Sequence, residues 1–427
     1  DDMRTLKNSI LLLFPSIIHG FYVYQRPVIR NFHSQISNSN NGNNNNNNNN
    51  NNDWMESLRA RQLELDHQQQ IVDYNWRNSK CKSSLPLSFP DWVRRLDMGD
   101  YPLVAVGSSS GNIFCANLET GKALARSYQQ EDEEELEGLD DILNILYSSY
   151  DGGGTIAIAM HKDLICSAGR QGSVQLWRVH PKDTKLISQG SLQALRGTLV
   201  TCLHLDDDYL WVGTSDGRLQ AYSHQSTDLP LALQTKPELE WNLGSPILSL
   251  SLCPSMGYGV VSTAKGTVEL FSMEDDDEII AQWKPPISSS NTYILSSTIV
   301  QYKDGDRYTL VCGCSDGTMY MQPLTYENGM FPDDENVFQP NRVKRLNPRH
   351  GGLVKCLTSP TPGILLSGGQ DGSLRVWNVS SEDDSYYLYQ FIGYKVWLGT
   401  VWTDGSRLLS DGADNALILH DFSDADP

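Results

Sequence analysis

Residues Leu365–Val379, LLSGGQDGSLRVWNV, decide the fold. The stretch holds two short apolar runs, Leu365-Leu366 and Leu374–Trp377, separated by Gly, Gln, Asp and Ser. Apolar runs bounded by turn residues are typical of β-strands, and so short a gap predicts a hairpin. The pair Asp371-Gly372 supplies the turn, because glycine tolerates positive φ and an aspartate side chain can hydrogen bond to its own backbone.

This hairpin recurs along the chain at intervals of 43 to 61 residues. Its turn position is occupied by Gly111, Gly172, Gly217, Gly266, Gly317, Gly372 and Asn415. Each turn follows a strand rich in small and apolar residues and precedes an alternating strand, which indicates seven copies of one four-stranded unit. A single unit leaves its faces uncovered, so such units stack radially into a propeller.

The segment from His350 to Trp377 resembles a WD40 repeat, and the resemblance to the WD40 family covers residues 92–422. It implies an all-β, seven-bladed propeller and, within a well-formed blade, a hydrogen-bonded tetrad. Only blade 6 has all four members: His350, Ser367, Asp371 and Trp377. A buried chain from the indole through Ser and His to Asp would satisfy every polar atom, so we predict a structural role for the tetrad.

The other blades keep only parts of this set. Blade 2 keeps Trp177, blades 3 and 5 keep the turn residues Asp216 and Asp316, and His420 fills the Trp position of blade 7. Gly107–Gly111 fits the pattern of a nucleophile elbow, but a strand follows where an elbow needs a helix, so a turn is predicted. The nine His and eight Cys show no zinc-ligand spacing. We therefore predict no catalytic residue, no metal and no cofactor.

Charge narrows the class of partner. The chain has 427 residues and a formal net charge of −19. Nucleic-acid surfaces need clustered Lys and Arg, so direct nucleic-acid binding is not expected. An acidic balance fits basic protein partners, or simple solubility. The run Glu131–Asp141, EDEEELEGLDD, is predicted to be a solvated loop, with a docking site for a basic partner as the alternative.

In WD40 propellers, partners commonly bind the face that carries the hairpin turns and the starts of the inner strands. By that resemblance, the candidate partner-binding residues are Arg170, Arg218, Gln370, Tyr394, Lys395 and Trp397. Exposed aromatic residues and arginines are the types that anchor interfaces. For Trp397, packing between blades is an equal alternative.

These features predict a non-catalytic protein–protein interaction scaffold that works in a multiprotein complex. One alternative is the substrate-receptor subunit of a ubiquitin ligase of the F-box/WD type, although no F-box is recognisable in Asp53–Trp76. Another is a propeller hydrolase, which would need convergent acids on the inner strands. Apart from Lys355, those strands show only His204 as an ionisable group, which disfavours an enzyme.

The first 34 residues have the composition of a targeting presequence. A basic start, the apolar run Ser9–Ile18 and the acid-free segment Phe21–Asn52 resemble the two-part plastid presequence of algae with complex plastids. The predicted location is therefore the plastid, or the cytoplasm or nucleus if Met3 is not the true start. The apolar run is too short to span a bilayer as a helix.

Between the presequence and the propeller, two segments differ in character. Residues 35–52 end in an unbroken Asn tract and are predicted to be a disordered linker. Residues 53–91 begin with a short helical arm over Asp53–Trp76, which we expect to dock on the side of the propeller. The alternative is a partner-binding arm like that of a G-protein β subunit. Lys82–Pro90 is predicted to complete the last blade and close the ring, and residues 423–427 form a tail.

Overall fold

The computed structural model describes most of the chain from the N-terminal helix onwards. The described residues are 48–126, 154–169, 172–179, 186–192, 198–224, 231, 234, 236–274, 279–287, 292–327, 330–332, 337–339, 341–394, 398–413 and 415–423. The predicted presequence, the acidic run Glu131–Asp141 and the C-terminal tail 424–427 lie outside them. Within the described residues, no helix combines the length and apolarity needed to cross a membrane.

The seven turn positions share one backbone conformation. Their φ angles are all positive, from 62° at Asn415 to 92° at Gly111. Glycine adopts this region at little cost, and asparagine is among the few other residues that tolerate it. Blade 7 can therefore use Asn415 where the other blades use glycine, and the same hairpin forms seven times.

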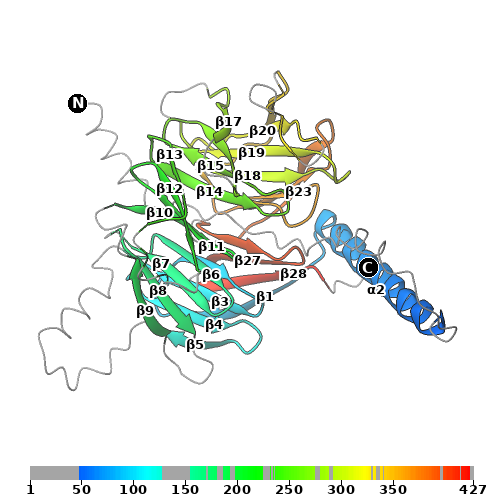
Figure 1. The fold of residues 1–427 in the computed structure, drawn as a ribbon, viewed down its shortest axis with the longest axis horizontal. Helices are drawn as coiled ribbons and strands as arrows, with labels where there is room; N and C mark the ends of the chain where they lie inside the picture. Colours follow the sequence, from blue (N-terminus) through cyan, green and yellow to red (C-terminus); the bar gives the residue numbers. More distant parts are fainter. Residues whose placement is uncertain are drawn as a thin grey trace, which may run out of the picture.

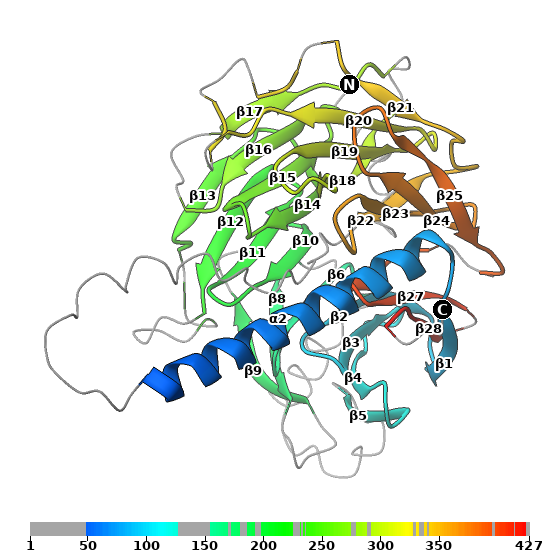
Figure 2. The ribbon, with the colours of Figure 1, turned by 90° about the vertical axis from the view of Figure 1, so that its right-hand side faces the viewer.

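Seven four-stranded antiparallel sheets form the blades of the predicted propeller (Figures 1 and 2). Blade 1 holds β2 (Val93–Met98), β3 (Leu103–Ser108), β4 (Ile113–Asn117) and β5 (Lys122–Arg126). Blade 2 holds β6 (Ala157–His161), β7 (Leu164–Ala168), β8 (Val174–Val179) and β9 (Leu186–Leu192). Blade 3 holds β10 (Val200–Leu205), β11 (Tyr209–Thr214), β12 (Arg218–Ser223) and β13 (Leu239–Asn242). The seven-bladed all-β fold expected from the sequence is confirmed.

The remaining blades follow the same order. Blade 4 holds β14 (Ile247–Cys253), β15 (Tyr258–Thr263), β16 (Val268–Ser272) and β17 (Ile279–Trp283). Blade 5 holds β18 (Ile294–Gln301), β19 (Tyr308–Cys314), β20 (Met319–Leu324) and β21 (Lys344–Leu346). Blade 6 holds β22 (Val354–Thr358), β23 (Ile364–Gly369), β24 (Leu374–Val379) and β25 (Ser385–Phe391). Blade 7 holds β26 (Val401–Thr403), β27 (Arg407–Ala413) and β28 (Ala416–Asp421), and takes its fourth strand from elsewhere.

The fourth strand of blade 7 is β1 (Lys82–Ser88), from the opposite end of the chain. It pairs antiparallel with β28, from Lys82 opposite Asp421 to Ser88 opposite Ala416, with an irregularity after Ser84. Because β1 occupies the edge of β28, the last blade has the same four strands as the others. The ring is thus closed by non-covalent pairing between an N-terminal strand and the C-terminal hairpin.

Helix α2 (Asn48–Arg77) precedes β1 and is the helix of the described residues. The sequence predicted that the helix starts at Asp53. The helix instead begins at Asn48, within the Asn tract that the sequence analysis assigned to a disordered linker. Asparagine is a weak helix former, yet it can extend a helix that the following residues have already formed. In Figure 1, α2 reaches away from the ring, starting from its contact with the last blade, and in Figure 2 it crosses in front of the ring.

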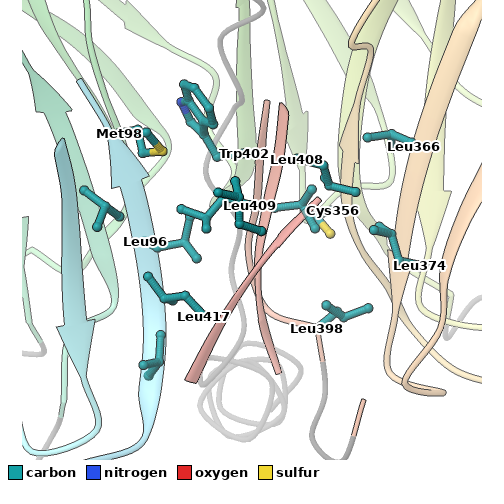
Figure 3. Packing of buried hydrophobic residues seen from close by; sticks show 14 of the residues in the cluster. Leu96, Met98, Cys356, Leu366, Leu374, Leu398, Trp402, Leu408, Leu409 and Leu417 are labelled. Atoms are coloured by element: carbon teal, nitrogen blue, oxygen red, sulfur yellow. The ribbon is translucent and has the colours of Figure 1, made fainter. Parts of the chain in front are cut away.

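One hydrophobic cluster joins the two ends of the chain. It contains Trp76 of α2, Leu87 of β1 and Phe422 after β28, together with residues of blades 1, 6 and 7. Figure 3 shows its centre, where Leu96 and Met98 of blade 1 approach Leu409 and Trp402 of blade 7. Apolar burial is the main favourable term in folding, so this cluster holds the closing blade between its two neighbours.

Leucines 85 and 87 test how far the closing strand contributes to stability. Leu87 is 8% exposed and belongs to the shared cluster, whereas Leu85 on the same strand is 66% exposed. Leu87→Asp should lower the free energy of unfolding by about 2–5 kcal/mol, because it removes apolar burial and places a carboxylate there. Urea denaturation measures this. The matched variant Leu85→Asp should change stability by less than about 0.5 kcal/mol, and equal losses would contradict the role given to β1.

Candidate functional site

The four tetrad residues of blade 6 meet in one hydrogen-bonded chain. The indole Nε1–H of Trp377 donates to Ser367 Oγ at 2.9 Å, and Ser367 Oγ lies 2.7 Å from His350 Nε2. His350 Nδ1 lies 3.1 Å from Asp371 Oδ1. Since Ser367 accepts from the indole, its hydroxyl donates to Nε2, and Nδ1–H then donates to the carboxylate. Every polar atom of the chain is paired.

Asp371 is the anchor of this chain. Its carboxylate also accepts from the amide of Gly351 at 2.8 Å, from Ser373 Oγ at 2.7 Å and from Arg375 Nη2 at 3.2 Å. Burial raises the pKa of Asp371, but the hydrogen bonds from His350, Gly351 and Ser373 outweigh it and hold that pKa well below its usual range. The aspartate is therefore ionised wherever the fold is stable.

The arrangement has the residue types of a catalytic triad but cannot act as one. Ser367, His350 and Trp377 are buried, with at most 1% of any of these residues exposed. Burial is also the main cause that lowers the pKa of His350, ahead of the raising effect of Asp371. A serine that accepts an indole N–H in a closed core has no access to a substrate. The tetrad holds β22, β23 and β24 together.

Blades 2 and 3 also contain a hydrogen bond from a buried tryptophan indole. Trp177 of blade 2 donates from Nε1 to Ser167 Oγ at 2.9 Å, as its counterpart in blade 6 does. In blade 3, the sequence pattern missed a different pair, in which Trp211 Nε1 donates to Asp206 Oδ2 at 2.8 Å. Trp211 lies on β11, outside the usual Trp position, so no repeat-based alignment would identify it. Blades 2 and 3 thus pair a buried indole with different partners, Ser167 and Asp206, whereas the buried Nε1 of Trp241 in blade 3 has no partner among the described residues.

In blade 7, His420 occupies the position of the tryptophan, and its ring is hydrogen-bonded to the closing strand β1. His420 Nδ1 lies 2.7 Å from Ser83 Oγ of β1, and its ring stacks on Phe391 with centroids 4.3 Å apart. Tyr394 OH lies 3.4 Å from His420 Nε2 and 3.3 Å from Ser410 Oγ. Tyr394, a predicted partner-binding residue, is thus half-buried with its hydroxyl directed into blade 7.

Of the six predicted partner-binding residues, the structure describes Arg218, Gln370 and Tyr394. Arg170, Lys395 and Trp397 lie outside the described residues. Arg218 lies in blade 3 and donates from Nε to Asp216 Oδ2 at 2.8 Å, whereas Gln370 lies in the turn of blade 6. Gln370 and Tyr394 therefore lie near the same turn of blade 6, and Arg218 lies in blade 3.

Several charged groups that the sequence interpretation overlooked are buried on or beside the inner strands. They are Arg95 of β2 and Asp411 of β27, in addition to His204 and Lys355, while Asp97 of β2 is half-buried. The prediction that His204 and Lys355 are the ionisable groups holds for β10, β14 and β22, the strands from which it was made, but does not extend to β2. The β2 residues fall in the stretch VRRLDM, whose apolar alternation is interrupted by charges and so gives a weaker strand signal.

Backbone amides bind the carboxylates of Asp97 and Asp411. Burial raises the pKa of Asp97 and of Asp411 to about 7 each, against the lowering effect of backbone amides. Asp97 accepts from the amides of Met98 and Met160, both at 2.9 Å. Oδ1 of Asp411 accepts from the amides of Gly399 and Thr400. Among the described residues, no three His, Cys, Asp or Glu side chains are grouped so as to hold a metal ion.

Helix α2 is attached to the propeller by its last residues. The ring of Trp76 stacks on Phe422 with centroids 3.6 Å apart, and its Nε1–H donates to the carbonyl of Gly405 at 2.8 Å. Asn75 Nδ2 donates to the carbonyl of Phe422, and Tyr389 OH donates to the carbonyl of Trp76 at 2.6 Å. These contacts tie the end of the helix to blades 6 and 7.

The middle of the helix is mostly exposed to solvent. Residues 56–70 are exposed except for Leu65, which is half-buried. Leu58 is 50% exposed and Leu63 69% exposed. The docking expected for the whole helix is therefore limited to Ile71–Arg77, and about four turns project into solvent.

Comparison with known proteins gives local likenesses. No protein-family model matches the sequence. A stretch of 75 residues is 39% identical to cilia- and flagella-associated protein 43 of Chlamydomonas reinhardtii, covering 18% of this chain and 4% of that protein. A stretch of 124 residues is 26% identical to THO complex subunit 6 of Drosophila melanogaster, covering 27% of this chain and 31% of that protein. The chain spans less than a third of the length of these relatives.

Removing the central hydroxyl tests the structural role of the tetrad. Ser367→Ala would leave the buried indole N–H of Trp377 and Nε2 of His350 without partners. We expect a loss of about 2–4 kcal/mol in the free energy of unfolding, measured by chemical denaturation. The control Ser84→Ala, at an exposed serine of β1, should change stability by less than about 0.5 kcal/mol. A loss no larger than that of the control would show that the chain of hydrogen bonds is not needed.

His420 should make the closing strand sensitive to acid. Burial lowers its pKa to about 4, whereas the unfolded chain would protonate near 6.5. Between these pH values the unfolded state binds more protons, so stability falls as pH decreases from about 6.5 to 4. His420→Phe, which keeps a ring against Phe391, should reduce this decrease by about 2 kcal/mol when unfolding is compared at pH 7 and pH 4.5. An unchanged pH dependence would contradict the assignment.

Proposed function

We propose that the chain is a non-catalytic scaffold of the WD40 type, whose projecting helix α2 holds a partner protein. The observation that carries this proposal is the partial docking of α2. Its last residues are fixed to blades 6 and 7, while residues 56–70 extend from the ring with two leucines exposed. A fixed base with exposed leucines on the part that projects is suited to contact with a partner.

Helix energetics support this interpretation. Helices of about 12–15 residues are marginal in water, and in proteins most of their stability comes from packing of an apolar face. The projecting part of α2 contains Gln68, Gln69 and Gln70 and lacks a covering surface in the described structure. Contact with another protein would supply the missing packing. A scaffold role explains both the length of the helix and its exposed leucines.

Membership of the WD40 family is part of the same proposal. It is supported by the complete tetrad of blade 6, by the Trp177–Ser167 pair of blade 2 and by the seven positive-φ turns. THO complex subunit 6 is by name a subunit of a complex, which fits a role in assembly. The net charge of −19 favours basic partners.

The alternative functions differ in what they require of the same parts. A ubiquitin-ligase receptor would use α2 to recruit the ligase and the propeller to hold the substrate, so the exposed helix is compatible with it. A propeller hydrolase is disfavoured, because Ser367 and His350 are sealed and the buried aspartates are bonded to backbone amides. We therefore place the interaction on α2 and no reaction in the ring.

Two leucines on the projecting helix allow a direct test. The double variant Leu58→Glu, Leu63→Glu should lower recovery of co-purifying proteins from the native cells at least about tenfold, which corresponds to the loss of ~1.4 kcal/mol of binding. The melting temperature should stay within about 1 °C, because neither residue contacts the propeller. Quantitative mass spectrometry after affinity purification measures recovery.

The matched control is Gln70→Glu, which adds a charge to the same helix at an exposed polar position. It should leave recovery unchanged. Loss of ligase subunits in the leucine variant would favour the receptor alternative. Full recovery with the leucine variant would overturn the role of α2.

A further inference from the structure

Each blade has one outer strand at the edge of its sheet: β1, β5, β9, β13, β17, β21 or β25. Within the described residues, the outer side of each of these strands pairs with no other strand. An open edge exposes backbone N–H and C=O groups that can pair with another chain. Proteins usually protect such edges with charged side chains, proline, bulges or a short strand, so the seven edges can be compared for these features.

Five of the other six outer strands carry a feature that weakens pairing with another chain. Charged side chains occur in β1, β5, β13 and β21; β1 also contains Pro86, and β21 has only three residues. In β9, Gly190 has a φ of 102°, which interrupts the regular strand. The sixth strand, β17, is uncharged but has only five residues.

Strand β25 of blade 6 lacks these features. Its sequence is SYYLYQF, seven residues without a charge, a proline or a glycine. Tyrosine and phenylalanine are among the residues that favour strands. Pairing of β25 with β24 has a bulge at Leu388, but β5, β9 and β17 have a bulge at the corresponding place, so the bulge does not distinguish β25.

The strand is held by its own blade and exposed on its outer side. Tyr387 packs on Trp377 with ring centroids 5.6 Å apart. By contrast, Tyr386 is 51% exposed, and Ile392, directly after the strand, is 74% exposed. Figure 2 shows β25 at the outer margin of the ring, beside the end of α2 that contacts the propeller. The edge is therefore both rigid and accessible.

Negative charge lies at the start of this edge. Glu382 forms an ion pair of 2.8 Å with Arg342, whereas Asp383 and Asp384 are exposed directly before the strand. A strand that added antiparallel to β25 would place its C-terminal end beside these two carboxylates. A Lys or Arg at that end is favoured there, because opposite charges attract.

We propose that β25 binds an extended segment of a partner protein as a fifth, antiparallel strand of blade 6, with a Lys or Arg of that segment beside Asp383 and Asp384. The backbone groups of the open edge supply the hydrogen bonds, as in other cases of strand addition. Tyr386 and Ile392 offer apolar contacts to alternate side chains of the segment. This edge is separate from the exposed leucines of α2 and is a second interaction surface.

A second copy of this chain fits the edge less well than an extended segment. Seven residues span about 23 Å, and pairing of two such edges buries less than the roughly 1,000 Å² that a stable interface between two folded proteins needs. Each copy also carries a net charge of −19, so two rings repel each other. A basic extended segment carries neither disadvantage.

The probe for the test is a display library of short random peptides, selected on the full-length chain. We expect the enriched peptides to have apolar residues at every second position and a Lys or Arg near the C-terminus. One enriched peptide, added in excess, should slow amide hydrogen exchange in Ser385–Phe391 at least about tenfold, because backbone hydrogen bonds protect amides. Exchange in β9, the outer strand of blade 2, should stay unchanged.

Two kinds of variant test the edge and the charge separately. Tyr386→Lys should weaken the enriched peptide at least about tenfold, because a charged side chain on an edge opposes pairing. Its control is Ile187→Lys, at a 40% exposed position of β9. The double variant Asp383→Lys, Asp384→Lys should also weaken the peptide at least about tenfold, and its control is Asp306→Lys, at an exposed acid of blade 5. Both controls should leave the affinity, measured by fluorescence anisotropy, unchanged.

The outcomes distinguish this edge from α2. Leu58→Glu, Leu63→Glu should leave the affinity of the peptide unchanged; a loss there would place the peptide on α2 and overturn the role of β25. Absence of enriched peptides, or binding that survives Tyr386→Lys, would also overturn it. A dimer of the unmodified chain that Tyr386→Lys converts to a monomer would assign the edge to a second copy instead. The molar mass from light scattering during gel filtration measures this.

Discussion

Closure of the ring by β1 is the constraint on which the rest of the structure depends. Six blades are built from consecutive strands, but the seventh lacks its outer strand until Lys82–Ser88 pairs with β28. The pairing brings α2 to the last blade, because Arg77 and Lys82 are separated by only a short connection. The position of the projecting helix is therefore a consequence of how the ring closes.

Blade 6 is the rigid neighbour that makes this attachment possible. Its tetrad satisfies the buried Trp377, and the adjacent Asn378 bonds through Oδ1 to Arg77 at the end of α2. Tyr389, on the outer strand of the same blade, donates to the carbonyl of Trp76. The blade that keeps all four tetrad residues is thus also the one that holds the helix. Blade 6 therefore both contains the complete tetrad and contacts the end of α2.

The sequence predicted features that repeat and missed features that arise between repeats. The turn glycines and Asn415 were identified because each blade presents them at the same place, and the tetrad because blade 6 keeps the complete family pattern. Arg95 and Asp411 lie more than 300 residues apart and come near each other, beside Gly399, only when the ring closes, so no pattern within one blade relates them. Tyr394 was expected on the partner-binding face from the family resemblance, and in the structure its hydroxyl lies 3.4 Å from Nε2 of His420 in blade 7.

The helix and the closing strand both contact blade 7. Trp76 stacks on Phe422, the residue that follows β28, while β1 pairs with β28 itself. A partner that binds α2 would therefore also affect blade 7, the blade that completes the ring. Since Trp76 and Phe422 share one hydrophobic cluster with blades 1, 6 and 7, binding that orders α2 would also stabilise the closed ring by linkage. A scaffold built this way gains stability from the complex that it assembles.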